Sequence, residues 1–120
     1  YFNHLTLFFN ILVKKFLNFM TIKEALDKYF GFDSLKPVQE EIINEILNKK
    51  NVLAILPTGA GKSLCYQIPA IVSENFSIVI SPLIALMKDQ VDSLNKKEKV
   101  ASFINSTLNN KEIENVFNEI

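Results

Sequence analysis

Residues 58–63, Thr-Gly-Ala-Gly-Lys-Ser, have the types and spacing that phosphate binding requires. Backbone N–H groups can approach a triphosphate closely only where side chains are absent, so Gly59 and Gly61 suit this task. Lys62 would lie against the β- and γ-phosphates, and the Ser63 hydroxyl would ligate Mg²⁺. A helix that begins at about Lys62 would add its positive dipole end to the anion site.

The sequence on either side predicts a strand before this loop and a helix after it. Residues 52–56 form a continuous apolar run, which is typical of a strand buried on both faces. The full phosphate-loop pattern has glycine at position 56, where this chain has Leu56. The alternative interpretation is a glycine-rich turn followed by a chance Lys-Ser. The predicted ATP-binding residues of the loop are Thr58, Gly59, Ala60, Gly61, Lys62 and Ser63.

Length and composition are those of one modest globular domain. The chain has 120 residues, of which 48% are hydrophobic and 22% charged, and its formal net charge is zero. A neutral chain has no global basic field, so any nucleic-acid binding must come from a local surface. The single cysteine, Cys65, excludes an intrachain disulfide and fits a reducing compartment; we interpret it as a small buried hydrophobic residue. No apolar run reaches the roughly 18 residues of a membrane span.

Residues 1–19 differ from the rest in being rich in Phe, Leu and Asn with almost no acid. A secretory signal is disfavoured because Lys14 and Lys15 follow the apolar part. An amphipathic helix that packs on the domain is a second possibility. We favour a third, in which the native protein starts at Met20 and residues 1–19 are an extraneous or poorly ordered extension.

Helical periodicity and end signals recur along the rest of the chain. Thr21 and Glu24 predict a capping box at the start of a helix that Gly31 ends. Pro37 suits the first turn of a second helix. Further helices are predicted over 62–73, with Pro69 as a kink or end, and over 83–94 and 110–120.

Short apolar runs between these helices predict strands at 52–56, 77–81 and 100–104. Strands that alternate with helices imply a parallel sheet with crossover connections, so we predict an α/β layered domain. Ligands of such sheets bind at the carboxyl ends of the strands, which is where the loop at 57–63 falls.

Four stretches of the chain together resemble the start of a RecQ-family DNA helicase of superfamily 2. They are residues 30–39, 56–70, 81–91 and 105–107, in order and with family-like spacing, so that the resemblance runs from about Met20 to Thr107. It implies a partial RecA-like domain, in which a parallel sheet is flanked by helices. It also implies a bacterial cytoplasmic or nucleoid location.

The resemblance adds an adenine-binding motif to the phosphate loop. Gln39 would read the adenine edge through its amide, which both donates and accepts hydrogen bonds. Phe32 would stack on the ring, where the family more often has Tyr. Lys36 stands where the family usually has Arg, and lysine lacks the planar fork that stacks and bonds bidentately. Without the motif, Gln39 would be interpreted as a surface amide and Phe32 as a core residue.

The resemblance also implies two segments that contact single-stranded DNA. The first runs from Ser81 to Lys88 and the second is the turn at 105–107. The implied DNA-binding residues are Ser81, Pro82, Leu83, Lys88, Asn105, Ser106 and Thr107. The alternatives are that Lys88 is an exposed helix charge and that the residues at 106 and 107 belong to the N-cap region of the last helix.

Two parts of an ATP-hydrolysing helicase have no counterpart in the sequence. The first is a strand that ends in Asp-Glu, which would hold Mg²⁺ and polarise the attacking water. The second is a further RecA-like lobe with the arginines that complete the nucleotide site. We therefore expect residues 20–120 to be the first part of lobe 1, truncated before the Walker B motif, and to bind nucleotide weakly without unwinding DNA.

The resemblance thus implies an N-terminal fragment of an ATP-dependent DNA helicase. The intact enzyme would couple ATP hydrolysis to 3′-to-5′ unwinding of single-stranded or partially duplex DNA, with Lys62 and Ser63 as its catalytic residues here. Another superfamily 2 ATPase, such as an RNA helicase, is one alternative. A degenerate, non-catalytic nucleotide-binding remnant is another.

Overall fold

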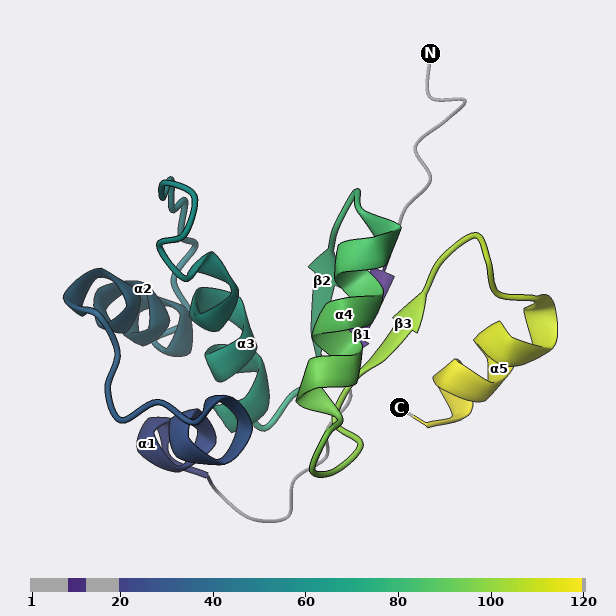
Figure 1. The fold of residues 1–120 in the computed structure, drawn as a ribbon, viewed down its shortest axis with the longest axis horizontal. Coiled ribbons are helices and arrows are strands. Elements are labelled where there is room, and N and C mark those ends of the chain that lie inside the picture. The colour runs from purple at the N-terminus through teal and green to yellow at the C-terminus, as the bar shows by residue number, and fades with distance from the viewer. Residues whose placement is uncertain (1–8, 13–19, 120) are drawn as a thin grey trace. The chain divides into compact units, whose positions relative to one another are not determined.

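The computed structural model describes residues 9–12 and 20–119, which form two compact units (Figure 1). The first, here called the loop unit, comprises the described residues up to Glu74 other than 9–12. The second, here called the sheet unit, comprises residues 9–12 and 75–119.

The loop unit is built from helices. They are α1 (Ile22–Ala25), a π-helical turn (Leu26–Phe30) that continues it, α2 (Pro37–Leu47) and α3 (Lys62–Val72). Both α1 and α2 pack against α3, and Ile43 and Ile68 are fully buried. The periodic apolar positions of the sequence therefore do form the core of this unit. The helix α3 continues through Pro69 and ends three residues later.

The end signals of the first helix are confirmed. The Thr21 hydroxyl accepts a hydrogen bond of 3.2 Å from the Glu24 amide, and the Glu24 carboxylate accepts one of 2.7 Å from the Thr21 amide. These bonds to Thr21 lower the pKa of Glu24. Gly31 adopts a left-handed conformation with φ of 67° and donates to the Asp27 carbonyl.

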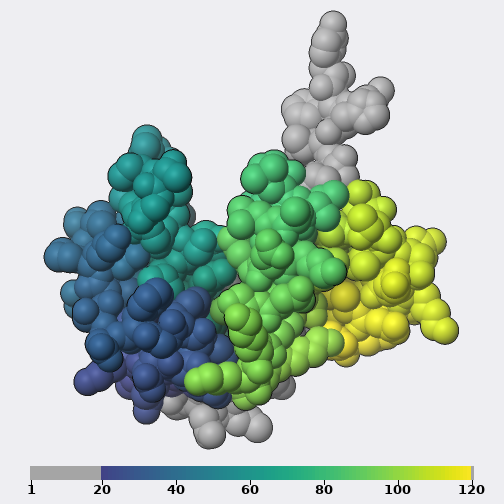
Figure 2. All heavy atoms as spheres, in the orientation of Figure 1, coloured from purple at the N-terminus to yellow at the C-terminus, as the bar shows by residue number. Residues whose placement is uncertain are grey.

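The predicted buried strand at 52–56 is wrong for this structure. The segment forms no strand and pairs with no described strand, and Leu53 and Ile55 are 89% and 88% exposed. Its connection between α2 and α3 projects beyond the ends of these helices, as Figures 1 and 2 show. An apolar run becomes a strand only where a neighbour completes its backbone hydrogen bonds, and residues 52–56 have no such partner among the described strands.

The sheet unit contains three strands and two helices. In chain order these are β1 (Phe9–Leu12), β2 (Ser77–Ile80), α4 (Ile84–Leu94), β3 (Ser102–Ile104) and α5 (Asn110–Asn118). The strand order is β2-β1-β3, and β1 pairs antiparallel with both neighbours. The predicted parallel sheet is therefore corrected to an antiparallel one. The sequence had not indicated a strand at 9–12, and the rest of 1–19 lies outside the described residues.

The register of the sheet places the ends of β2 and β3 level with each other. Phe9 pairs with Ile80 on one side and with Ile104 on the other. Both outer strands run antiparallel to β1, so they run in the same direction and end at the same edge. Since neighbouring strands lie about 4.8 Å apart, the two ends are separated by roughly 10 Å.

The helices of the sheet unit bury few of their side chains. The predicted apolar face of α4 buries Met87, Val91 and Leu94, whereas Leu83 and Leu86 are exposed. No residue of α5 is buried, although α5 contacts β3. The N-cap of α5 is Asn109, whose side chain accepts from the Glu112 amide, so Ser106 and Thr107 precede the cap itself.

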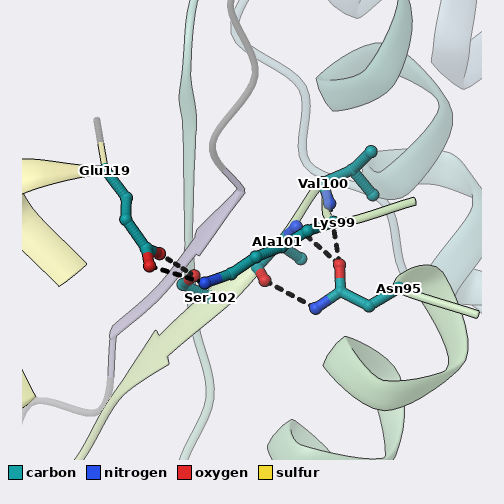
Figure 3. Close-up of polar contacts among 6 residues, drawn as sticks. All are labelled: Asn95, Lys99, Val100, Ala101, Ser102 and Glu119. Carbon is teal, nitrogen blue, oxygen red and sulfur yellow. Dashed lines mark hydrogen bonds and ion pairs between the residues drawn. The ribbon is translucent and has the colours of Figure 1, made fainter. Parts of the chain in front are cut away.

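Polar side chains fix the approach of the chain to β3 (Figure 3). The side-chain Oδ1 of Asn95 accepts hydrogen bonds of 2.8 and 2.9 Å from the backbone amides of Val100 and Ala101, and its Nδ2 donates one of 2.8 Å to the Ala101 carbonyl. Glu119 accepts from Lys99 at 2.6 Å and from Ser102 at 3.2 Å. These bonds join the end of α4, the start of β3 and the end of α5.

No helix in the described part of the chain is long and apolar enough to cross a membrane.

Candidate nucleotide-binding site

The phosphate loop of the loop unit is a turn that two left-handed glycines shape. Gly59 has φ of 79° and Gly61 has φ of 78°, a region that residues with a side chain rarely adopt. The Ala60 amide donates to the Pro57 carbonyl at 3.2 Å. Nothing lies within 4 Å of where a Gly59 side chain would begin, so this side of the loop is open to a ligand.

A cavity of about 460 Å³ lies beside this loop within the loop unit. Six of the predicted nucleotide-binding residues line it, namely Phe32, Lys36, Gln39, Gly59, Gly61 and Ser63. The structure thus brings residues from two distant stretches of the sequence to one site. Thr58, Ala60 and Lys62 lie in or next to the loop but do not line the cavity.

Four further residues line the same cavity and were not assigned a role from the sequence. They are Phe30, Ser34, Leu64 and Gln67. The helical spacing contained a signal for Gln67, since it follows Ser63 by four positions and therefore lies one turn along the same face of α3. With Phe30 and the 52% exposed Phe32, the cavity combines aromatic and apolar side chains with a few polar groups, which is typical of small-molecule sites.

Gln39 is buried, with 3% of its surface exposed, and its amide holds the phosphate loop. Its Oε1 accepts from the Lys36 amide at 2.9 Å. Its Nε2 donates to the carbonyl oxygens of Ala60 at 3.3 Å and Gly61 at 3.1 Å. The alternative of a solvated surface amide is therefore excluded in this structure.

The Lys62 ammonium donates a hydrogen bond of 3.1 Å to the Leu56 carbonyl, at the start of the same loop. This bond joins a cation to a neutral acceptor at an exposed site. A phosphate oxygen would be a stronger acceptor because both partners would then be charged.

Ser63 is the residue of this site best suited to a magnesium ion. Its hydroxyl lines the cavity and accepts a hydrogen bond of 3.4 Å from the Tyr66 hydroxyl. Mg²⁺ prefers oxygen ligands and usually keeps several waters and phosphate oxygens, so one protein hydroxyl is compatible with it. No group of three His, Cys, Asp or Glu residues that could hold a metal is found among residues 9–12 and 20–119.

Cys65 is a buried residue of α3, as the sequence indicated. Its Sγ lies 4.0 Å from the Gly61 carbonyl oxygen. Burial raises the pKa of its thiol. A thiol with a raised pKa is protonated at neutral pH and is a poor nucleophile.

The residues predicted to contact DNA all belong to the sheet unit. Ile80 at the end of β2 and Ile104 at the end of β3 both pair with Phe9. Ser81 and Asn105 are the next residues after them along the chain. Lys88 is exposed one turn into α4. The N-terminus of α4 adds its positive dipole end at the same edge.

Four of the residues predicted to contact DNA form local hydrogen bonds with one another, Leu83 with Ser81 and Thr107 with Asn105. Ser81 Oγ accepts from the Leu83 amide at 3.3 Å. The buried Asn105 side chain accepts from the amide and the hydroxyl of Thr107 at 2.9 and 2.6 Å. Asn105 therefore shapes the turn after β3, in which Ser106 and Thr107 are exposed. Pro82 and Leu83 are exposed between β2 and α4.

A loop with left-handed glycines, a lysine and a serine at the start of a helix, beside an apolar cavity, defines a phosphate-loop nucleotide-binding protein. Residues 36–120 match the DEAD/DEAH box helicase family. The chain belongs to this family.

Among its relatives are proteins named ATP-dependent DNA helicase RecQ. The one from Haemophilus influenzae is 43% identical over 109 residues, which is 91% of this chain and 18% of the relative. The one from Bacillus subtilis is 49% identical over 92 residues, covering 76% of this chain and 16% of the relative. A relative from Acanthamoeba polyphaga mimivirus, 47% identical over 90 residues (75% of this chain and 16% of that protein), carries the description of an RNA helicase. The chain thus spans less than a fifth of the length of these relatives.

Proposed function

We propose that the cavity beside the phosphate loop binds Mg²⁺-ATP and that the chain is the nucleotide-binding part of a RecQ-type ATP-dependent DNA helicase. The observation that carries the proposal is the cavity itself. It joins the loop residues Gly59, Gly61 and Ser63 to the aromatic Phe32. These are the parts that a nucleoside triphosphate needs, an anion site at one end and a stacking surface for the base at another.

In this proposal the loop backbone and Lys62 bind the phosphates, and Ser63 ligates Mg²⁺. When bound, the ion would neutralise charge on the phosphate oxygens. The loop residues Thr58 and Ala60 would contribute backbone contacts. Lys36 and Phe32 would flank the base, and Gln39 would keep the loop in its binding conformation.

We also propose that the edge where β2 and β3 end contacts single-stranded DNA. Its support is the register that brings Ser81 and Asn105 to the same edge, next to the exposed Lys88 and the N-terminus of α4. Backbone phosphates would be bound by the helix end and by Lys88, in a manner that does not depend on base sequence.

Coupling of ATP hydrolysis to 3′-to-5′ unwinding belongs, in this proposal, to a longer protein of the length of the relatives. The described residues would then be the first part of a RecA-like lobe that precedes the Walker B motif. The 120-residue chain is expected to bind nucleotide without hydrolysing it.

A titration of Mg²⁺-ATP that follows thermal unfolding of the 120-residue chain tests the nucleotide site. A ligand that binds only the folded state stabilises it by about 2.7 kcal/mol at a concentration of 100 times its Kd. Selective stabilisation of the unmutated chain, and not of Lys62→Ala, supports the site. The exposed Lys23 on α1 provides the control variant Lys23→Ala, which should respond like the unmutated chain. No stabilisation by ATP or by tripolyphosphate would overturn the proposed site.

A further inference from the structure

The Ser63 hydroxyl, which is proposed above to bind Mg²⁺, has a hydrogen-bond partner on its own helix. The Tyr66 hydroxyl donates to Ser63 Oγ across 3.4 Å. The two residues are three positions apart on α3, a spacing at which helical side chains are neighbours. Ser63 lines the cavity, whereas Tyr66 is half-buried and does not belong to the cavity lining. Tyr66 therefore contacts the serine from outside the space that the ligand would fill.

A serine hydroxyl at the start of a helix has several orientations available to it. The oxygen can occupy more than one staggered rotamer, and in some of them the hydroxyl bonds a carbonyl of the preceding turn. Only a rotamer that points the oxygen into the cavity presents a lone pair to a metal ion there. A neighbour that bonds this oxygen from a fixed position favours one rotamer over the others.

Tyr66 is suited to this task by its chemistry and by its support. The tyrosine ring turns about only two side-chain torsions, so holding it in place costs little conformational entropy. The adjacent Cys65 and Gln67 are buried, which fixes the part of α3 that carries the ring. A serine oxygen has two lone pairs, so the bond from Tyr66 occupies one and leaves the other for a metal ion.

From this geometry we infer that Tyr66 is a positioning residue that orients the Ser63 hydroxyl toward Mg²⁺. The inference rests on the proposed function, in which Ser63 is the metal ligand. Partners that lie behind a metal ligand orient it and contribute to metal affinity without touching the ion. Tyr66 would accordingly affect the binding of the ion and not the binding of the phosphates by the loop.

The affinity for ATP with and without the ion separates these two effects. We would measure the Kd of ATP for the 120-residue chain by thermal titration, once with Mg²⁺ and once with EDTA. Tyr66→Phe keeps the ring and removes only the hydroxyl. It should weaken binding of Mg²⁺-ATP by about fivefold, as the loss of one hydrogen bond implies. Binding of ATP in EDTA and the thermal midpoint without ligand should stay as in the unmutated chain.

A second background tests whether Tyr66 acts through Ser63. Ser63→Ala removes the metal ligand itself, so Tyr66→Phe should have no further effect on Mg²⁺-ATP affinity when the two changes are combined. Tyr29→Phe is the matched control, because it removes the hydroxyl of another half-buried tyrosine of the loop unit outside the cavity lining. It should bind ATP like the unmutated chain under both conditions.

The outcomes distinguish this inference from the proposed function. If Tyr66→Phe weakens ATP binding equally with Mg²⁺ and with EDTA, or leaves both unchanged, the inference is overturned and the nucleotide site stands. The same holds if its effect persists undiminished beside Ser63→Ala. If the unmutated chain binds ATP equally well with and without Mg²⁺, Ser63 is not a metal ligand and the inference is wrong. If the unmutated chain binds no ATP under either condition, the proposed function fails and the inference with it.

Discussion

The Nε2 atom of Gln39 lies 3.1 Å from the carbonyl oxygen of Gly61, to which it donates a hydrogen bond. This bond joins the start of α2 to the turn that precedes α3, across 22 positions of the sequence. A carbon atom added at Gly61 would lie 2.3 Å from the same nitrogen. The glycine is therefore required both by its backbone conformation and by the close approach of the glutamine.

Gly61→Ala should destabilise the loop unit more than Gly59→Ala. Both changes place a side chain in a left-handed conformation, at about 1–2 kcal/mol each, but only the first displaces Gln39. The free energy of unfolding from urea titrations measures the difference. Equal losses would show that the contact between Gln39 and Gly61 does not contribute to stability.

Gln39→Ala should lower the affinity for tripolyphosphate as well as for ATP, by a similar factor. The reason is that the amide holds the carbonyls of Ala60 and Gly61, and so the loop that binds the phosphates. Isothermal titration of both ligands with Mg²⁺ checks this expectation. A loss confined to ATP would return Gln39 to the adenine-contacting role that the resemblance implied.

Lys88→Ala should weaken binding of labelled single-stranded DNA at low salt. Each phosphate contact removed should reduce the slope of log Kobs against log salt by about 0.7. Fluorescence anisotropy at several salt concentrations measures the slope, and Lys111→Ala, an exposed lysine of α5, is the matched control. Equal slopes for the two variants would exclude Lys88 from the interface.

The same titration with single-stranded RNA distinguishes the alternative of an RNA helicase.

Glu119→Gln should destabilise the sheet unit slightly at neutral pH, and the difference should vanish in acid. The hydrogen bond from Lys99 lowers the pKa of Glu119 below its usual value of 4.5. A lowered pKa means that the stabilisation is fully present above pH 4.5 and is lost as the pH falls through the folded-state pKa. Thermal midpoints of both proteins between pH 3 and pH 7 test this. A difference in thermal midpoint that does not change with pH would show that the charged Glu119 carboxylate and its hydrogen bond from Lys99 are not its cause.

The helices and their end signals could be predicted from the sequence because they depend on local spacing. The capping box at Thr21 and the left-handed Gly31 are examples. The strands predicted at 77–81 and 100–104 are also confirmed, as β2 and β3. The pairing of the sheet could not be predicted, because it depends on partners far away along the chain. The run at 52–56 is apolar enough for a buried strand, yet the middle of the sheet is formed by residues 9–12, which the sequence analysis had set apart.

The candidate site, too, could be predicted from the sequence only in part. The phosphate loop could be predicted because glycine, lysine and serine have few other reasons to follow one another at this spacing. The bonds that engage Gln39 and the burial of Gln67 depend on how α2 and α3 pack. Periodicity places Gln67 on the face of Ser63, but only the packed structure shows that it lines the cavity.

The exposed segment at 52–56 has a consequence for how the isolated chain behaves in solution. Leu53 and Ile55 are the most exposed large apolar residues of a stretch that has no partner strand among the described residues. Such stretches template intermolecular pairing and are recurrent aggregation hazards. Colloidal stability of the 120-residue chain should therefore fall steeply with concentration, and a charged residue at position 53 or 55 should delay the onset of light scattering without touching the cavity residues.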